Sequence, residues 1–379
     1  MARCATCGAT SPLTSRAIGV CKECLVERPE EALRVAMEGH RASRAEFGLP
    51  PEPPRSPGGK PCNLCAAKCV MAEGEVGYCG IRGVRDGKMW SLSGADSGLL
   101  DYYLDPHVTN CCNAWFCPAG TGCGYPKFAV RDGPEVGYYN LALFFYGCSL
   151  NCQFCQNWTH KAISRGKRVT TRELVEVTLR NERITCWCWF GGSAEPQLPF
   201  AVNASRTVLE EKGERRVVRI CWEWNGDGNP ALVRRAGELS LASGGNVKFD
   251  LKAFTRSVHV ALTGMDNEEI LRNFELVYDE FYERRRDVPV LGATTLLVPQ
   301  YVDEREVDQI ARFIASLDPE IPYSLLVFNP DFRMSDVPVT PERQVWECYR
   351  AAKRHLRNVN VGNLHLLALW RSGLSARLL

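Results

Sequence analysis

Short apolar runs alternate with amphipathic stretches over the last two thirds of the chain. The apolar runs occupy residues 141–146, 184–190, 217–224, 246–252, 290–298 and 323–328. Runs of this length that end in turn residues are typical of buried parallel strands. The stretches between them predict helices at 171–180, 231–241, 268–284, 304–317 and 341–355. This alternation predicts an α/β domain over residues 138–379, with a parallel sheet and right-handed crossovers.

Glycines and charged residues follow the predicted strands. Gly191 and Gly192 come after the second strand, where the lack of a Cβ lets the backbone approach a ligand closely. Asp250 and Lys252 end the fourth strand, and charges at the tip of a buried strand are costly unless they are paired or used. Because ligands bind at the carboxyl ends of parallel strands, we expect these residues in one site. A simple glycine turn and a local salt bridge are the alternatives.

Three cysteines follow the first predicted strand within eight residues: Cys148, Cys152 and Cys155. Thiolates at this density suit a cubane iron–sulfur cluster. A fourth cysteine at short spacing is missing, which leaves one iron open to bind and reduce a substrate. The alternative is a closed zinc or iron–sulfur site that a distant cysteine completes.

Residues 148–155, with an aromatic residue just before the third cysteine, resemble the signature loop of the radical S-adenosylmethionine (radical SAM) enzymes. This resemblance implies a [4Fe-4S] cluster on Cys148, Cys152 and Cys155 whose free iron chelates S-adenosylmethionine. It also implies reductive cleavage of that cosubstrate to methionine and a 5′-deoxyadenosyl radical. Phe154 is then the aromatic residue that faces the adenine.

The likeness continues in the branch related to the pyruvate formate-lyase activating enzymes, from about residue 62 to residue 363. The motifs on which this resemblance rests are residues 250–252, 262–267, 294–299, 329–334 and 361–363. The resemblance implies a partial, open barrel of six strand–helix units and an electron donor of the flavodoxin or ferredoxin type.

The branch also implies roles at the strand ends. Gly191 and Gly192 would bind the methionyl amino group, and Asp250 and Lys252 would address the cosubstrate carboxylate or the substrate backbone. Glu195 stands two residues later than in the usual Gly-Gly-Glu, because Ser193 and Ala194 intervene. The ribose contacts would come from Glu223 and Asn225, for which an Asn-Gly surface turn is the alternative.

Composition narrows the class of protein. The chain has 379 residues, 45% hydrophobic content and a formal charge of +2, with no basic run, so we expect no nucleic-acid partner. No apolar stretch approaches the ~18–20 residues of a transmembrane helix, and we expect no membrane association. Nineteen cysteines without an export signal predict metal ligands in a reducing, cytoplasmic setting.

Two CxxC pairs open the chain: Cys4 with Cys7, and Cys21 with Cys24. Four thiols at this spacing predict a zinc-ribbon-like module over residues 1–28. Residues 29–60 predict a helix followed by a proline-rich linker, so we expect the module to be separable.

Residues 61–137 form a cysteine-rich segment upstream of the sheet. Its eight cysteines are Cys62, Cys65, Cys69, Cys79, Cys111, Cys112, Cys117 and Cys123. We expect at least one auxiliary metal centre here, either iron–sulfur or zinc, with buried free thiols as the alternative. Four later cysteines are interpreted as core thiols, although two of them share one face of the second strand: Cys186, Cys188, Cys221 and Cys348.

Three functions follow from these patterns. The first is a radical SAM enzyme that abstracts hydrogen from a protein or peptide, as glycyl-radical activases do. The second is a radical SAM enzyme that modifies a small molecule and uses auxiliary clusters as electron relays. The third is a non-catalytic multi-metal protein of zinc or ferredoxin type, which would not need the glycine and Asp-Lys strand ends.

Overall fold

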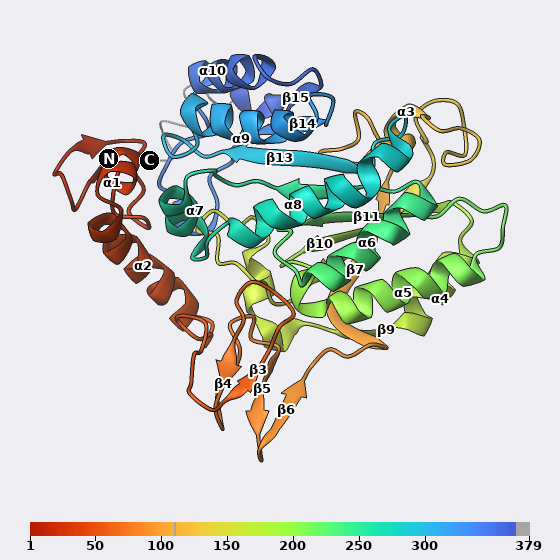
Figure 1. Cartoon of the computed structure of the whole chain (residues 1–379), viewed down its shortest axis with the longest axis horizontal. Helices are drawn as coiled ribbons and strands as arrows, with labels where there is room; N and C mark the ends of the chain where they lie inside the picture. The colour runs from red at the N-terminus through yellow and green to blue at the C-terminus, as the bar shows by residue number, and fades with distance from the viewer. Residues whose placement is uncertain (110, 369–379) are drawn as a thin grey trace.

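A nine-stranded sheet forms the centre of the computed structural model, which describes residues 1–109 and 111–368 (Figure 1). Seven neighbouring strands are parallel and lie in the sheet in their order along the chain. They are β8 (Tyr139–Phe145), β10 (Ile184–Gly191), β11 (Arg219–Trp224), β12 (Val247–Asp250), β13 (Leu291–Leu297), β14 (Tyr323–Val327) and β15 (Val359–Gly362). All six predicted strands are confirmed. The prediction of six parallel strands was wrong by one, because the short strand β15 contains Asn360 and has no apolar run.

Antiparallel strands extend one edge of this sheet. β7 (Ser97–Pro106) pairs with β8, and β9 (Arg168–Thr170) pairs with β7. The sheet is therefore mixed and mostly parallel, where a purely parallel one was expected. Because β7 belongs to the cysteine-rich segment, that segment contributes a strand to the central sheet.

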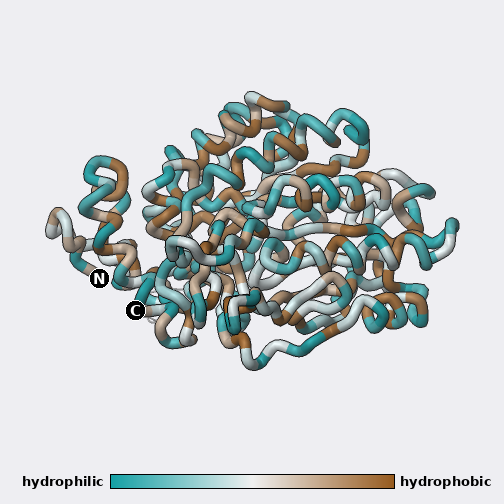
Figure 2. The backbone as a smooth tube through the Cα atoms, turned by 60° about the horizontal axis from the view of Figure 1, so that its bottom comes forward, coloured by the Kyte–Doolittle hydropathy of each residue, from teal (hydrophilic) through white to brown (hydrophobic). Residues whose placement is uncertain are grey.

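Helices connect the parallel strands. They are α4 (Thr171–Arg180), α5 (Leu198–Glu211), α6 (Pro230–Ser243), α7 (Arg256–Thr263), α8 (Glu268–Phe281), α9 (Glu304–Leu317) and α10 (Glu342–Lys353). Side chains cap several of them: Thr170 accepts from the Glu173 amide, and Asp303 accepts from the first amides of α9. The helices at 198–211 and 256–263 were not predicted. Along the outer helices, hydrophobic and hydrophilic residues alternate as amphipathic packing requires (Figure 2).

The two faces of the sheet differ in chemistry. Residues that face the helices are buried and apolar and include four fully buried tryptophans of β10 and β11, of which Trp189 stacks on Trp222 at 5.9 Å between ring centroids. The Trp189 indole also donates to Ser205 of α5 at 2.9 Å. Successive strand side chains alternate in direction, so the residues in between face the inside of the curved sheet. Those residues are thiols and charged groups: Cys186, Cys188, Cys221, Glu223, Lys248 and Asp250.

The N-terminal part lies at one side of the molecule in both views (Figures 1 and 2). It consists of the β1 (Ala2–Arg3) and β2 (Thr10–Ser11) hairpin, α1 (Lys22–Glu27) and α2 (Pro29–Ala45). It is attached to the sheet domain: the Tyr301 hydroxyl donates to the Val20 carbonyl at 2.8 Å, and Ser15 donates to Asp336 at 2.9 Å.

Two small hairpins and short helical turns complete the chain. The hairpins are β3 (Lys60–Pro61) with β4 (Val70–Met71), and β5 (Arg82–Arg85) with β6 (Lys88–Ser91). The turns are α3 (Pro118–Thr121), η1 (Trp158–Lys161), η2 (Ile163–Arg165), η3 (Glu195–Gln197), η4 (Tyr282–Arg285), η5 (Phe332–Met334) and η6 (Leu364–Leu366). Among the described residues, no helix combines the length and hydropathy that crossing a bilayer requires.

Candidate functional site

The three cysteines of residues 148–155 lie on the loop that leaves β8, which we call the radical loop (residues 147–157). The loop begins at Gly147, whose φ is +79°, and a Cβ there would lie 2.8 Å from the Cys79 carbonyl oxygen. Only glycine satisfies both demands without strain. Cys148 is buried, whereas Cys152 and Cys155 are partly exposed, so the loop presents its thiols to a half-open site.

Cys148 meets two of the predicted cofactor residues. Its Sγ lies 3.1 Å from the Gly192 carbonyl oxygen, and the Asn225 amide donates to the same sulfur at 3.4 Å. The Leu150 backbone N–H donates to it as well, at 3.4 Å. The structure therefore brings the ends of β10 and β11 against the radical loop.

Steric contacts explain why two glycines follow β10. A Cβ on Gly192 would lie 2.1 Å from the Gly147 carbonyl oxygen, which is an impossible contact. Gly191 has φ +74° and lies against Phe144. The pair lets two loops pass with backbone touching backbone, and the Gly192 carbonyl points toward the cysteine sulfur.

Lys161 is the most important residue that the sequence interpretation missed. Its side chain is buried and its Nζ donates to Asn151 Oδ1 at 2.6 Å. Burial lowers the pKa of Lys161, while the thiols of Cys148, Cys152 and Cys155 act in the opposite direction. A buried ammonium group therefore stands beside the three thiols. A lysine six residues after Cys155 belongs to no motif, so no local pattern pointed to it.

The donor set of the radical loop fits an iron–sulfur cluster. Burial raises the pKa of Cys148 to about 12 and that of Cys152 to about 11, and the nearby Lys161 ammonium lowers both. Because metal binding requires the thiolate form, it must offset the free energy that burial adds to deprotonation of these thiols. The ammonium of Lys252 also favours the Cys152 thiolate. Three thiols with two nearby cations match the negative charge of a thiolate-bound cluster.

The predicted pair at the end of β12 is part of a longer row of charges. Lys252 Nζ lies 2.7 Å from Asp250, Lys248 Nζ lies 2.6 Å from the other oxygen of Asp250, and Lys248 also lies 3.5 Å from Glu223. Burial alone would raise the pKa of Asp250, but the two ammonium groups hold it well below its ordinary value. The salt-bridge alternative is thus real, yet the bridge is half-buried and extends toward the radical loop.

Two other predicted residues lie behind the loop surface. Glu195 is fully buried and accepts from the Gly226 amide at 2.6 Å, so it braces the turn after β11, and burial raises its pKa. Phe154 is buried and packs edge-on against Phe328 at 6.5 Å between centroids. Glu223 faces the inside of the sheet rather than the turn, where Cys112 and Lys248 contact it.

Helix α2 holds the radical loop from outside. The amides of Asn151 and Gln153 both donate to His40 Nδ1, at 3.0 and 2.9 Å, and both also contact the Ser43 hydroxyl. His40 Nε2 lies 2.9 Å from the Ala261 carbonyl oxygen. Residues 29–45 are therefore a support of the loop and not only a connection. The sequence contained a sign that His40 is buried, because it continues the i, i+4 series of Ala32 and Ala36 on one face of the helix.

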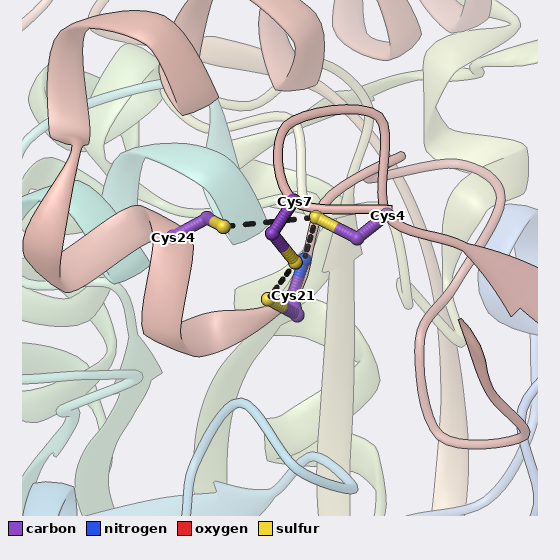
Figure 3. Close-up of side chains that lie close together, drawn as sticks. All are labelled: Cys4, Cys7, Cys21 and Cys24. Atoms are coloured by element: carbon purple, nitrogen blue, oxygen red, sulfur yellow. Dashed lines mark hydrogen bonds between the residues drawn. The ribbon is translucent and has the colours of Figure 1, made fainter. Parts of the chain in front are cut away.

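The four N-terminal cysteines converge on one point (Figure 3). Their ligand atoms all lie within 4.8 Å of one another, and the Cys4–Cys24 and Cys7–Cys21 sulfur separations are both 3.8 Å. A tetrahedron with metal–sulfur bonds of ~2.3 Å has edges of about 3.8 Å. The predicted four-cysteine arrangement is confirmed, and it fits a single metal ion.

The eight cysteines of the cysteine-rich segment separate into three environments. Cys62, Cys65, Cys69 and Cys79 lie together, and the Cys79 carbonyl oxygen packs against Gly147 of the radical loop. Cys111, Cys112 and Cys117 lie inside the curved sheet. Cys123 instead turns to the Phe116 carbonyl of its own loop, at 3.3 Å. The segment is thus not one compact metal site.

The comparisons decide the family. The model described as "Radical SAM superfamily" matches residues 143–314. The chain is 36% identical over 262 residues to the isethionate sulfite-lyase activating enzyme of Desulfovibrio desulfuricans, which covers 54% of this chain and 81% of that protein. This chain belongs to the radical SAM superfamily. Membership implies a [4Fe-4S] cluster and S-adenosylmethionine, and it makes the protein an activating-enzyme-like radical SAM enzyme.

Other relatives of this radical SAM enzyme extend the match. An uncharacterized protein of Methanocaldococcus jannaschii is 24% identical over 315 residues, covering 80% of this chain and 81% of that protein. The pyruvate formate-lyase-activating enzyme of Staphylococcus aureus is 28% identical over 213 residues, covering 52% of this chain and 76% of that protein. The non-catalytic hypothesis is therefore set aside.

Proposed function

We propose that this radical SAM enzyme abstracts a hydrogen atom from a protein or peptide, in the manner of a glycyl-radical activase. Cys148, Cys152 and Cys155 would hold the [4Fe-4S] cluster. One observation carries the cleavage chemistry in this proposal: Cys148 meets the ends of β10 and β11, Lys252 after β12 favours the Cys152 thiolate, and the buried ammonium of Lys161 lies beside the thiols. When bound, the cluster supplies the electron that cleaves S-adenosylmethionine reductively.

The residues around the loop have distinct tasks in this proposal. The carbonyl groups of Gly191 and Gly192 would bind the methionyl ammonium, because neither residue has a side chain that keeps a ligand from the backbone. Phe154 would pack against the adenine. The side-chain amide of Asn225 donates a hydrogen bond to Cys148, so it positions that sulfur. The same side chain would contact the ribose. Glu195 acts through the turn that it braces.

Asp250 and Lys252 are proposed to bind the substrate backbone or the cosubstrate carboxylate. Both are half-buried at the end of β12 and oppositely charged, so together they present an acceptor and a donor. A peptide group needs the same pair. Two similar proteins are activating enzymes of other enzymes by name, which supports a protein or peptide substrate. An electron donor of the flavodoxin or ferredoxin type would reduce the cluster.

A second candidate is the modification of a small molecule. The thiols inside the sheet favour it, because auxiliary clusters could relay electrons in such a reaction. Both candidates share the radical loop and differ only in what enters the site.

The test uses the reconstituted enzyme with S-adenosylmethionine and dithionite under anaerobic conditions. A cell extract is divided by ultrafiltration into a protein fraction and a small-molecule filtrate, and 5′-deoxyadenosine is measured with each. We expect the protein fraction to stimulate its formation, with an organic radical visible by electron paramagnetic resonance (EPR) on a protein. Stimulation by the filtrate alone would support the second candidate. The matched control is the Cys148→Ala, Cys152→Ala, Cys155→Ala variant, which should respond to neither.

A further inference from the structure

Five cysteines from three distant parts of the chain meet inside the curved sheet, and we call them the inner thiol group. Its members are Cys111, Cys117, Cys186, Cys188 and Cys221. They line one cavity together with His107, Asn140 and Asn246. Three come from β10 and β11, and two come from the inner segment, residues 111–137. Only the fold brings them together, because Cys117 and Cys186 are separated by nearly seventy residues.

The contacts within the group form a connected chain of sulfurs. Cys186 Sγ lies 3.6 Å from Cys221 Sγ, and the Cys188 thiol contacts both Cys111 and Cys221. Cys117 lies close enough to Cys111 and Cys221 to raise its pKa by charge repulsion. Free cysteines often fill core positions as small hydrophobes, but such residues have no reason to gather from separate elements.

The spacing of these thiols differs from that of the N-terminal site. Among residues 1–109 and 111–368, only Cys4, Cys7, Cys21 and Cys24 offer thiols that all lie within 4.8 Å of one another. Although Cys186 and Cys221 lie 3.6 Å apart, no three of the described inner thiols all lie within 4.8 Å of one another, so they do not form the tetrahedron of a single ion, whose ligand sulfurs lie about 3.8 Å apart. A row of thiols of this length suits a cluster of several irons, which cysteine thiolates hold.

Charged groups surround the inner thiol group on both sides. Arg219 is buried and ion-paired to Glu135, and its charge favours the thiolates of Cys117 and Cys186. On the other side Cys188 Sγ lies 3.9 Å from Glu223, where the row Glu223, Lys248, Asp250 and Lys252 begins. Lys252 ends this row near Cys152 of the radical loop. A continuous series of charged side chains thus connects the two groups of thiols.

We propose that the inner thiol group binds a second iron–sulfur cluster inside the sheet, at the end opposite the radical loop. The inner segment closes this site, since it contacts the amino-terminal parts of the strands: the Asn113 amide donates to Asn246 at 2.9 Å, and the Trp115 indole donates to Ser324 at 2.9 Å. This site does not use the thiols of the radical loop. The proposal therefore does not depend on whether the substrate is a protein or a small molecule.

The test replaces three of the five thiols in the full chain. The Cys111→Ser, Cys117→Ser, Cys188→Ser variant leaves two thiols, too few for a cluster. The matched control is Cys123→Ser with Cys348→Ser, which removes two thiols outside the group. After anaerobic reconstitution with iron and sulfide, we expect the triple variant alone to lose iron and acid-labile sulfide in equal amounts. The EPR signal that S-adenosylmethionine perturbs should remain in both.

Equal iron and sulfide contents in the triple variant and the control would overturn the proposal, and so would a loss of zinc alone. A second measurement does not depend on the folding of the triple variant. The Cys148→Ala, Cys152→Ala, Cys155→Ala variant keeps all inner thiols, and it must still bind iron and sulfide with a cluster Mössbauer spectrum. Absence of that spectrum would overturn the inner cluster while leaving the proposed function intact.

Discussion

At the scale of single residues, Lys161 places a positive charge in the buried surroundings of the radical loop. The hydrogen-bond partner of its Nζ is the neutral side chain of Asn151. Among the described residues, no carboxylate lies within hydrogen-bond distance of this Nζ. Charges act more strongly away from water, so this ammonium should affect the electron affinity of whatever the three thiols bind.

We predict that Lys161→Gln lowers the reduction potential of the cluster by on the order of tens of millivolts, because it removes a nearby positive charge while keeping a donor for Asn151. At a given potential of the external reductant, a smaller fraction of the cluster should then be reduced. A redox titration followed by EPR measures the potential. Lys167→Gln is the control, since Lys167 is 80% exposed. Equal midpoint potentials in the two variants would rule out the electrostatic role.

His40 allows a second prediction at this scale. Burial lowers its pKa to about 4, so the folded chain keeps it neutral where the unfolded chain, with a pKa near ~6.5, takes up a proton. Stability from this group is therefore lost as the pH falls below ~6.5. The stability of the parent protein relative to His40→Asn should decrease by up to about 1.4 kcal/mol per pH unit between pH 6.5 and 4.

Urea unfolding of the apoprotein at pH 7.0 and pH 5.0 measures this difference. A stability difference between the parent and His40→Asn that does not change with pH would contradict the assigned burial of a neutral imidazole.

At the scale of elements, the inner segment depends on one buried ion pair. Glu135 accepts from both terminal nitrogens of Arg219, at 2.7 and 2.5 Å, and also from Thr185 and the Val130 amide. Burial would raise the pKa of Glu135, but Arg219 and these donors lower it. The pair ties the inner segment to the starts of β10 and β11.

We predict that Glu135→Gln lowers the free energy of unfolding by about 3–5 kcal/mol, because it leaves the Arg219 charge buried without its counterion. Thermal and urea unfolding measure the effect. Glu176→Gln breaks the exposed pair with Arg180 and should change the stability little. A similar small effect of both substitutions would show that the inner segment is held by other contacts.

The N-terminal module leads to a different prediction. Cys7→Ser with Cys21→Ser should remove one equivalent of zinc, since two thiols cannot complete the tetrahedral site. Cleavage of S-adenosylmethionine should persist, because the cysteines themselves do not contact the radical loop in the described structure. Metal analysis and 5′-deoxyadenosine formation test both parts. Loss of cleavage in a folded, cluster-bearing variant would place the module in the mechanism.

Removal of residues 1–60 is expected to act differently. If the module were separable, as the sequence predicts, a truncation before Cys62 would leave cleavage intact. The structure argues against this, because the truncation also removes His40 and Ser43, which accept hydrogen bonds from Asn151 and Gln153. An unsatisfied buried amide costs about 1–3 kcal/mol, so the radical loop should lose its order.

At the scale of the whole molecule, local patterns predicted the strands and the radical loop. Runs such as 141–146 are apolar and closed by a glycine, and the three-cysteine spacing is contained in eight residues. β7 was missed because Asp101 and Asp105 interrupt its apolar pattern, and β15 was missed because it is short and polar. Long-range relations were missed for another reason: no local pattern links His40 to Asn151, or Cys111 to Cys188.

Cys186, Cys188 and Cys221 are buried, as their interpretation as core thiols predicts. The shared face of Cys186 and Cys188 on β10 was the one sign in the sequence of a further role. The tryptophans next to them in sequence fill the helical side of the sheet, which leaves the thiols on the inner side. Cys348 remains a core thiol, buried between α10 and the Val302 carbonyl.

The central claim is that Cys148, Cys152 and Cys155 form the centre that cleaves S-adenosylmethionine. The most direct measurement is the rate of 5′-deoxyadenosine formation with dithionite, compared between the parent enzyme and the variant in which all three cysteines are alanine. We predict that formation is abolished in the variant, while its zinc content and fold are retained. Formation at the parent rate would contradict the account.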